Sequence, residues 1–209
     1  MKIACRDILV ILFLFLIPAC ATFEPVNIDK TTGLFPASAE VDKKYIKVYR
    51  PVAGVQDINY LYLRAYSPYG NDKFYGFMKD ALSKIGFKTI YSEKELAQRV
   101  IASGLSNCGV TNISDLISLN NLAKATGPFL VMECNVFRVG DAVYRFDLQL
   151  IDPLSGETYL EISRIRIAWL NVDREVNYPM LNVIKQWYDE SAKLPHGGKR
   201  IEILEGKPI

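Results

Sequence analysis

Residues 129–169 decide the fold class, and they read FLVMECNVFRVGDAVYRFDLQLIDPLSGETYLEISRIRIAW. Two turn signals divide this stretch, Val139-Gly140-Asp141 and Asp152-Pro153-Leu154-Ser155-Gly156, because Gly, Pro and Asp favour tight turns. Between the turns, apolar and polar residues alternate with the period of two that is typical of a half-buried strand. The stretch therefore predicts an antiparallel meander of strands at 129–138, 142–152 and 157–169, with one face on the core and the other in water.

The apolar residues change phase within the last of these strands. They occupy even positions first (Leu160, Ile162) and odd positions afterwards (Ile165, Ile167, Trp169). A β-bulge adds one residue to a strand and so shifts its phase. We therefore expect a bulge near Ser163–Arg164.

Helix and strand patterns alternate on both sides of the meander. Residues 58–66 alternate as a strand, and residues 71–85 carry an apolar stripe at helical spacing that ends at Gly86. Ser92 and Glu95 form a capping box that begins a second helix. A third helix precedes Gly127-Pro128, a fourth begins near Pro179, and short strands are expected at 45–49 and 87–91. This order predicts an α/β (α+β) domain, with a mixed sheet that contains the 129–169 meander and four helices packed on it.

The N-terminus has the pattern of an export signal. Lys2 and Arg6 precede an apolar run from Ile8 to Ala19, and Cys20 follows. The run is too short to span a bilayer, which needs roughly twenty apolar residues, and it matches a signal-peptide core. Ile17-Pro18-Ala19-Cys20 resembles the lipobox of bacterial lipoproteins, in which the Cys thiol receives the diacylglycerol.

This resemblance implies a domain division and an address. We expect a lipoprotein signal peptide at 1–19, a lipidated N-terminus with a flexible tether at 20–44, a single domain at 45–194 and a tail at 195–209. Lipoproteins kept in the inner membrane usually carry Asp after the lipidated Cys, whereas this chain has Ala21. The resemblance therefore implies the outer membrane of a double-membrane bacterium, with the domain facing the periplasm.

Composition and cysteine content narrow the class of partner. The chain has 25 Lys+Arg and 23 Asp+Glu, a formal net charge of +2, which gives no electrostatic case for nucleic acid. Cys108 and Cys134 remain after Cys5 and Cys20 are assigned to the signal and the lipid. In an oxidising periplasm they either form a disulfide or stay as two separate buried thiols, and both alternatives remain open.

The order of elements also resembles a group of bacterial envelope domains. The group includes the curli-secretion lipoprotein, the lipoprotein activators of penicillin-binding proteins and the N-terminal domain of the Tol-Pal translocation protein. The similar features are Leu122-Ala123-Lys124-Ala125-Thr126-Gly127 before a core strand, and Leu150-Ile151-Asp152-Pro153-Leu154-Ser155-Gly156-Glu157 at a strand end. The resemblance implies a periplasm-facing adaptor that binds envelope proteins, with a homo-oligomer as a further partner state.

Residue types for catalysis are scarce. His196 is the only histidine and lies in a Pro/Gly-flanked segment, and no metal-binding, Walker or dinucleotide motif is present. We therefore expect no catalytic residues, no metal and no cofactor. The carboxylates near the hairpins (Asp141, Asp147, Asp152, Glu157) leave a lipid-anchored hydrolase of wall glycans as an alternative, and a subunit of an oligomeric export channel as another. Glu133, in an apolar strand, is expected to pair with Arg145 or Arg138.

Tyrosine marks one face of the first strong strand. Tyr60, Tyr62 and Tyr66 share that face with Arg64. Tyrosine is common at protein interfaces because it combines area with a hydroxyl group. The face is therefore a candidate interaction surface, and the alternative is that a helix covers it.

Replacing Cys20 tests the anchor. In cells fed labelled palmitate, we expect the parent chain to incorporate label and to fractionate with membranes. A Cys20→Ser variant has no thiol to acylate, so it should lose both properties. A variant that is processed and membrane-bound like its parent, with no label in either, would contradict the lipoprotein assignment.

Overall fold

The computed structural model describes residues 23, 27–105, 109–110, 112–168 and 171–195. The expected signal peptide, Cys20, Cys108, Trp169 and His196 lie outside the described residues. The described chain forms a mixed sheet of six strands with α-helices packed on it, which confirms the predicted fold class.

The elements follow the predicted order. The strands are β1 (Ile46–Tyr49), β2 (Leu61–Tyr66), β3 (Ile90–Tyr91), β4 (Leu130–Gly140), β5 (Val143–Ile151) and β6 (Thr158–Ile167). The α-helices are α2 (Asn71–Ile85), α3 (Glu93–Ala102), α4 (Leu116–Thr126) and α5 (Tyr178–Ala192). Two 3-10 turns, η1 (Lys43–Tyr45) and η2 (Val55–Asp57), precede β2, and a π-helical turn, η4 (Asp173–Asn177), leads into α5.

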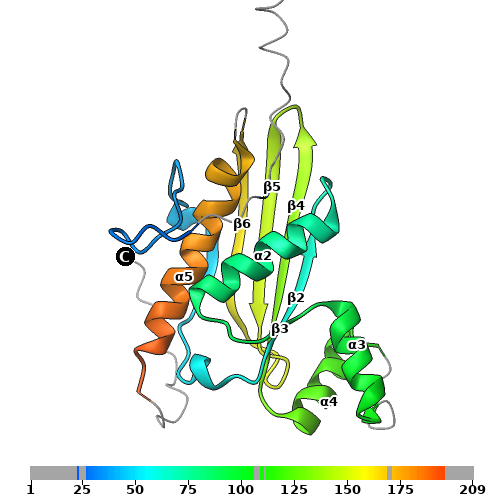
Figure 1. Cartoon of the computed structure of the whole chain (residues 1–209). Coiled ribbons are helices and arrows are strands. Elements are labelled where there is room, and N and C mark those ends of the chain that lie inside the picture. The colour runs from blue at the N-terminus through cyan, green and yellow to red at the C-terminus, as the bar shows by residue number, and fades with distance from the viewer. Residues whose placement is uncertain (1–22, 24–26, 106–108, 111, 169–170, 196–209) are drawn as a thin grey trace, which may run out of the picture.

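The strands lie in the order β1-β6-β5-β4-β2-β3. The meander β4-β5-β6 is antiparallel as predicted, β1 pairs antiparallel with β6, and β2 is parallel to both β3 and β4. Figure 1 shows α2 and α5 side by side on one face of the sheet, whereas α3 and α4 lie together at one end. The sheet therefore has an inner face under α2 and α5, and an opposite face that α3 and α4 cover only in part.

The main core lies between the inner face and the helices α2 and α5. Phe146, Leu148 and Leu150 of β5 are fully buried there, as the alternation of the strand predicts. They meet the predicted stripe of α2 and, from α5, Trp187. Each fully buried side chain of this kind contributes about 1.5–3 kcal/mol relative to an exposed one, which makes this layer the principal source of stability.

Local signals place the helices as predicted. The Ser92 hydroxyl accepts from the Glu95 N–H at 3.2 Å, and the Ser92 N–H donates to the Glu95 carboxylate at 2.7 Å, which completes the capping box. This backbone hydrogen bond lowers the pKa of Glu95 to about 2. Gly86 ends α2 with φ +135°, and a Cβ there would lie 2.6 Å from the Tyr188 ring of α5. Only glycine allows that helix end and that close approach of α5 together.

The expected bulge at Ser163–Arg164 is wrong. The pairing of β5 with β6 runs unbroken from Val143↔Ile167 to Leu150↔Leu160, and its register shifts only between Leu150 and Ile151. Because the pleat is not interrupted, Ile165 and Ile167 point away from the inner face and are 55% and 54% exposed. Arg164 takes the inner position instead and is 4% exposed.

The segment expected to be a flexible tether packs on the domain over its described residues. Phe35 is 3% exposed and stacks on Tyr178. Its N–H donates to the Asn182 side-chain oxygen at 2.7 Å, and the Asn182 amide donates back to the Phe35 carbonyl at 3.0 Å. The Ser38 N–H also donates to the Arg174 carbonyl at 2.9 Å. These contacts correct the tether interpretation, because residues 27–44 form a strap along η4 and α5.

Two isoleucines of β6 test its register. We expect Ile162→Ala to lower the free energy of unfolding by about 2–5 kcal/mol, because it leaves a cavity in the core. Ile165→Ala should change the same quantity by no more than about 0.5 kcal/mol, because that side chain is exposed. Denaturant unfolding of both variants measures the difference, and equal losses would support the bulge instead.

Replacing Phe35 tests whether the strap belongs to the folded domain. We expect Phe35→Ala to lower the free energy of unfolding by about 3 kcal/mol or more. Glu40→Ala, at an exposed position of the same segment, should change it by less than about 0.5 kcal/mol. A Phe35→Ala variant as stable as its parent in thermal unfolding would restore the tether interpretation.

Candidate functional site

The face of the sheet opposite α2 and α5 carries a broad accessible surface beyond α3 and α4. We call this surface the open face and define it by side chains that are half-buried or exposed. Its members are Lys47 of β1, Arg64 and Tyr66 of β2, Glu133, Asn135 and Phe137 of β4, Arg145, Asp147 and Gln149 of β5, and Glu161, Ser163, Ile165 and Ile167 of β6. The alternation of five neighbouring strands places them on one side, since every second residue points outward.

Ion pairs order the charged members of the open face. Lys47 Nζ lies 3.1 Å from Glu161 Oε1, and Arg145 Nε lies 2.9 Å from Asp147 Oδ2. The Ser163 hydroxyl donates to the other Asp147 oxygen at 2.7 Å. Pairs that are partly exposed contribute only about 0–1 kcal/mol to stability, so their main effect is to hold the side chains in defined positions.

Glu133 pairs with a different arginine from the two expected. Its carboxylate binds the guanidinium of Arg64, and neither Arg145 nor Arg138 contacts it among the ion pairs of the described residues. Arg64 lies directly beside Glu133 because β2 runs parallel to β4 in the register Arg64↔Glu133. Hairpin geometry alone points to neighbours on β5, so the sequence lacked the signal for this pair.

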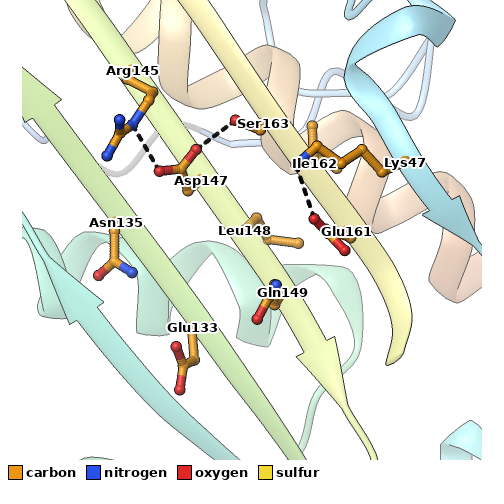
Figure 2. A pocket seen from close by; sticks show the side chains of 10 residues that line it. All are labelled: Lys47, Glu133, Asn135, Arg145, Asp147, Leu148, Gln149, Glu161, Ile162 and Ser163. Carbon is orange, nitrogen blue, oxygen red and sulfur yellow. Dashed lines mark hydrogen bonds and ion pairs between the residues drawn. The ribbon is translucent and has the colours of Figure 1, made fainter. Parts of the chain in front are cut away.

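A shallow depression lies in the middle of the open face. It has a volume of about 380 Å³ and is lined by residues of β1, β4, β5 and β6. In Figure 2 the lining side chains stand on neighbouring strands, and the pairs Arg145–Asp147 and Lys47–Glu161 flank Leu148. Cations, carboxylates and the amides of Asn135 and Gln149 alternate across it, so the surface presents hydrogen-bond donors and acceptors side by side.

Apolar and aromatic groups lie on the open face beside these polar groups. Tyr66 is 45% exposed and its ring lies 5.7 Å from that of Phe137. The Arg145 guanidinium lies 4.7 Å from the centre of the Phe137 ring, within cation–π range. Ile165 and Ile167 follow on β6. Sequence reasoning missed both isoleucines because it assigned them to the core, although the flanking Arg164 and Arg166 continue the same alternation.

The structure separates the three tyrosines proposed as an interaction surface. Tyr60 and Tyr62 are 4% and 0% exposed, and they pack with Leu96 of α3 and Leu122 of α4. Burial raises the pKa of both phenols to about 12, so they stay neutral at pH 7. The alternative, that helices cover this face, is therefore correct for Tyr60 and Tyr62. Only Tyr66, beyond the two helices, remains on an accessible surface.

Cys134 is a fully buried free thiol on the inner face, and burial raises its pKa. Its expected partner Cys108 lies outside the described residues. The choice between a disulfide and two separate buried thiols therefore stays a prediction.

The carboxylates considered for hydrolysis do not converge. Asp141 lies in the β4–β5 turn, whereas Asp152 and Glu157 lie in the β5–β6 turn, and the nine residues of β5 between them span about 30 Å. Asp152 has a structural role, since it accepts from the Leu154 N–H, the Ser155 hydroxyl and the Tyr159 hydroxyl. Of the set, only Asp147 faces the depression, and there it is paired with Arg145.

Within the described ranges, no cluster of three or more His, Cys, Asp or Glu side chains is arranged to hold a metal ion. None of the helices in that part of the chain has the length and apolar character needed to cross a membrane.

No protein-family model matches the chain, and no curated protein matches it. Solved structures with a similar arrangement include the LpoB C-terminal domain from Salmonella enterica, which is 15% identical, with a TM-score of 0.36 over 58% of this chain and 87% of that one. The PelC dodecamer from Paraburkholderia phytofirmans is 11% identical, with a TM-score of 0.40 over 71% and 96%. Lipoprotein GNA1162 from Neisseria meningitidis is 15% identical, with a TM-score of 0.35 over 52% and 80%. At these scores the function has to be argued from the chain's own residues.

Proposed function

We propose that this chain is a lipid-anchored accessory protein of the bacterial cell envelope that binds another protein through the open face, without catalysis. The observation that carries the proposal is the combination, on one accessible sheet face, of ordered ion pairs with exposed aromatic and branched side chains. We infer that the partner is a protein of envelope assembly or secretion.

The chemistry of the open face fits a protein partner. Protein interfaces mix apolar groups with hydrogen-bonding and charged groups, and aromatic residues and arginine are enriched in them. The open face offers Tyr66 and Phe137 beside the arginines, and each cation lies near a carboxylate. Because its charges are balanced, the surface has no excess positive charge to attract a polyanion. Ion pairs that already hold these side chains reduce the conformational entropy lost on binding.

The proposal also includes a lipid anchor and a cellular location. Ile17-Pro18-Ala19-Cys20 supports acylation of Cys20 after cleavage, and Ala21 supports the outer membrane with the domain in the periplasm. Several acyl chains are needed for stable attachment, because each buried CH₂ contributes only about 0.8 kcal/mol. Acylation would hold the open face near one membrane, where a partner meets it at a high local concentration.

Site-specific photo-crosslinking in cells tests the open face. We expect a photoreactive residue at Gln149 to give one discrete adduct, because that position lies in the depression. A photoreactive residue at Gln186, exposed on α5, serves as the matched control on the opposite side of the molecule and should give none. The mass of the adduct distinguishes a different protein from a second copy of the chain.

Charge reversal gives the second readout of the same experiment. We expect Glu133→Arg to reduce the Gln149 adduct by at least about ten-fold while the melting temperature changes little, because a half-exposed pair contributes little stability. Equal adducts at Gln149 and Gln186, or an adduct that is insensitive to Glu133→Arg, would contradict the proposed binding surface.

A further inference from the structure

Phe23, which follows closely after the proposed lipid site, lies in the folded core. Phe23 is 7% exposed, and its ring lies 5.3 Å from that of Phe74 and 5.9 Å from that of Phe77. Phe23 follows Cys20 by three residues. Three residues of extended chain span at most about 11 Å, so the backbone of Cys20 stays within about that distance of Phe23, which packs on the first turns of α2.

These first turns lie at the same end of the molecule as the β4–β5 turn. The Tyr69 hydroxyl, just before α2, donates to the Tyr144 hydroxyl of β5 at 2.8 Å. Tyr144 pairs with Arg138 of β4 on one side and with Arg166 of β6 on the other. Figure 1 shows the β4–β5 turn at the end of the sheet remote from α3 and α4. We call residues 138–143 together with 165–168 the hairpin end.

The distance between the lipid site and the hairpin end can be estimated along the strand direction. Phe74 follows Tyr69 by about one helical turn. Measured along the strand direction, the Phe74 ring therefore lies within roughly 10 Å of the level of Arg138. From Arg138, three residues of strand lead to the tip at Asp141, which is again about 10 Å. The tip at Asp141 therefore lies at most roughly 20 Å from the level of Phe74, and about 11 Å of that separation is within reach of Cys20. A bilayer that holds the acyl chains can therefore also contact the hairpin end.

The composition of the hairpin end suits a lipid surface. Val139, Ile165 and Ile167 are each more than half exposed there. Arg138 and Arg166 are exposed on the other side of the same sheet end, in register with Tyr144. Asp141, which lies 3.4 Å from Arg138, is the acidic residue of the described hairpin end. Branched apolar side chains and arginines at one end of a domain are typical of surfaces that enter the interface of a bilayer, where arginine reaches anionic headgroups.

We propose that the hairpin end is a membrane-contact surface. With Cys20 acylated, Val139, Ile165 and Ile167 enter the interface of the bilayer while Arg138 and Arg166 bind its anionic headgroups. The inference rests on the lipid anchor of the proposed function and adds to it a second, noncovalent contact that fixes the orientation of the domain. The sheet then stands upright on the membrane, α3 and α4 lie farthest from it, and the open face apart from Ile165 and Ile167 is turned sideways toward a partner.

Fluorescence quenching in vesicles tests this contact with the full lipoprotein. The protein is reconstituted into vesicles of phosphatidylethanolamine and phosphatidylglycerol, with an environment-sensitive dye on Val139→Cys. Leu154→Cys, exposed in the β5–β6 turn at the other end of the sheet, carries the dye as the matched control. We expect brominated lipid to quench the dye at 139 at least about three-fold more than the dye at 154.

Two variants separate the surface contact from the anchor. Ile165→Ser with Ile167→Ser, and separately a long Gly/Ser insertion between Ala21 and Thr22, should reduce quenching at 139 toward the level at 154 while the protein still floats with the vesicles. Equal quenching at both positions in protein that floats would overturn the membrane contact and leave the proposed function intact. Protein that carries no acyl group and does not float would overturn the anchor, and this inference with it.

Discussion

The uninterrupted pleat of the meander is the constraint on which the rest of the structure depends. Because β5 and β6 stay in one register from Val143↔Ile167 to Leu150↔Leu160, every even position of these strands in that span faces α2 and α5, and every odd position faces outward. The fully buried Phe146, Leu148 and Leu150 follow from this rule, and so do the exposed Ile165 and Ile167. A bulge would hide the two isoleucines and expose Arg164. The sheet keeps its register instead, at the cost of placing a guanidinium on the apolar side, where desolvation lowers the pKa of Arg164.

Local patterns predicted the helices and strands, but they did not predict the contacts between residues that are far apart in the sequence. The alternation in 58–66, the stripe of α2 that ends at Gly86, and the capping box of Ser92 and Glu95 each depend on residues a few positions apart, so they could be recognised in advance. The Arg64–Glu133 pair joins residues that meet only because β2 lies parallel to β4. The cover over Tyr60 and Tyr62 likewise depends on where α3 and α4 dock. The strap was mistaken for a tether because its two-way bond between Phe35 and Asn182 links distant parts of the chain without any periodic pattern.

The partition of the second sheet face explains how a small domain combines a stable core with an accessible surface. α3 and α4 cover one end, where Tyr60, Tyr62 and Val131 are apolar. Beyond the helices, the same strands present arginines, carboxylates and amides. The charged groups are paired and stay partly accessible to water, so they avoid the free-energy cost of a buried, unpaired ion. The tyrosine-rich strand thus changes role along its length, from core at Tyr62 to surface at Tyr66. The candidate site begins where the cover of the helices ends.

Phe23 packs against Phe74 and Phe77. This contact links the folding of the domain to the proposed cleavage and lipidation at Cys20. A protease that cuts before Cys20 has to grip the chain on both sides of the bond in an extended form, and three residues leave about 10 Å between that bond and the folded core. With the proposed cleavage before Cys20, Phe23 would enter the aromatic cluster only after the leader has been removed, and its entry would then be a closing step of biogenesis.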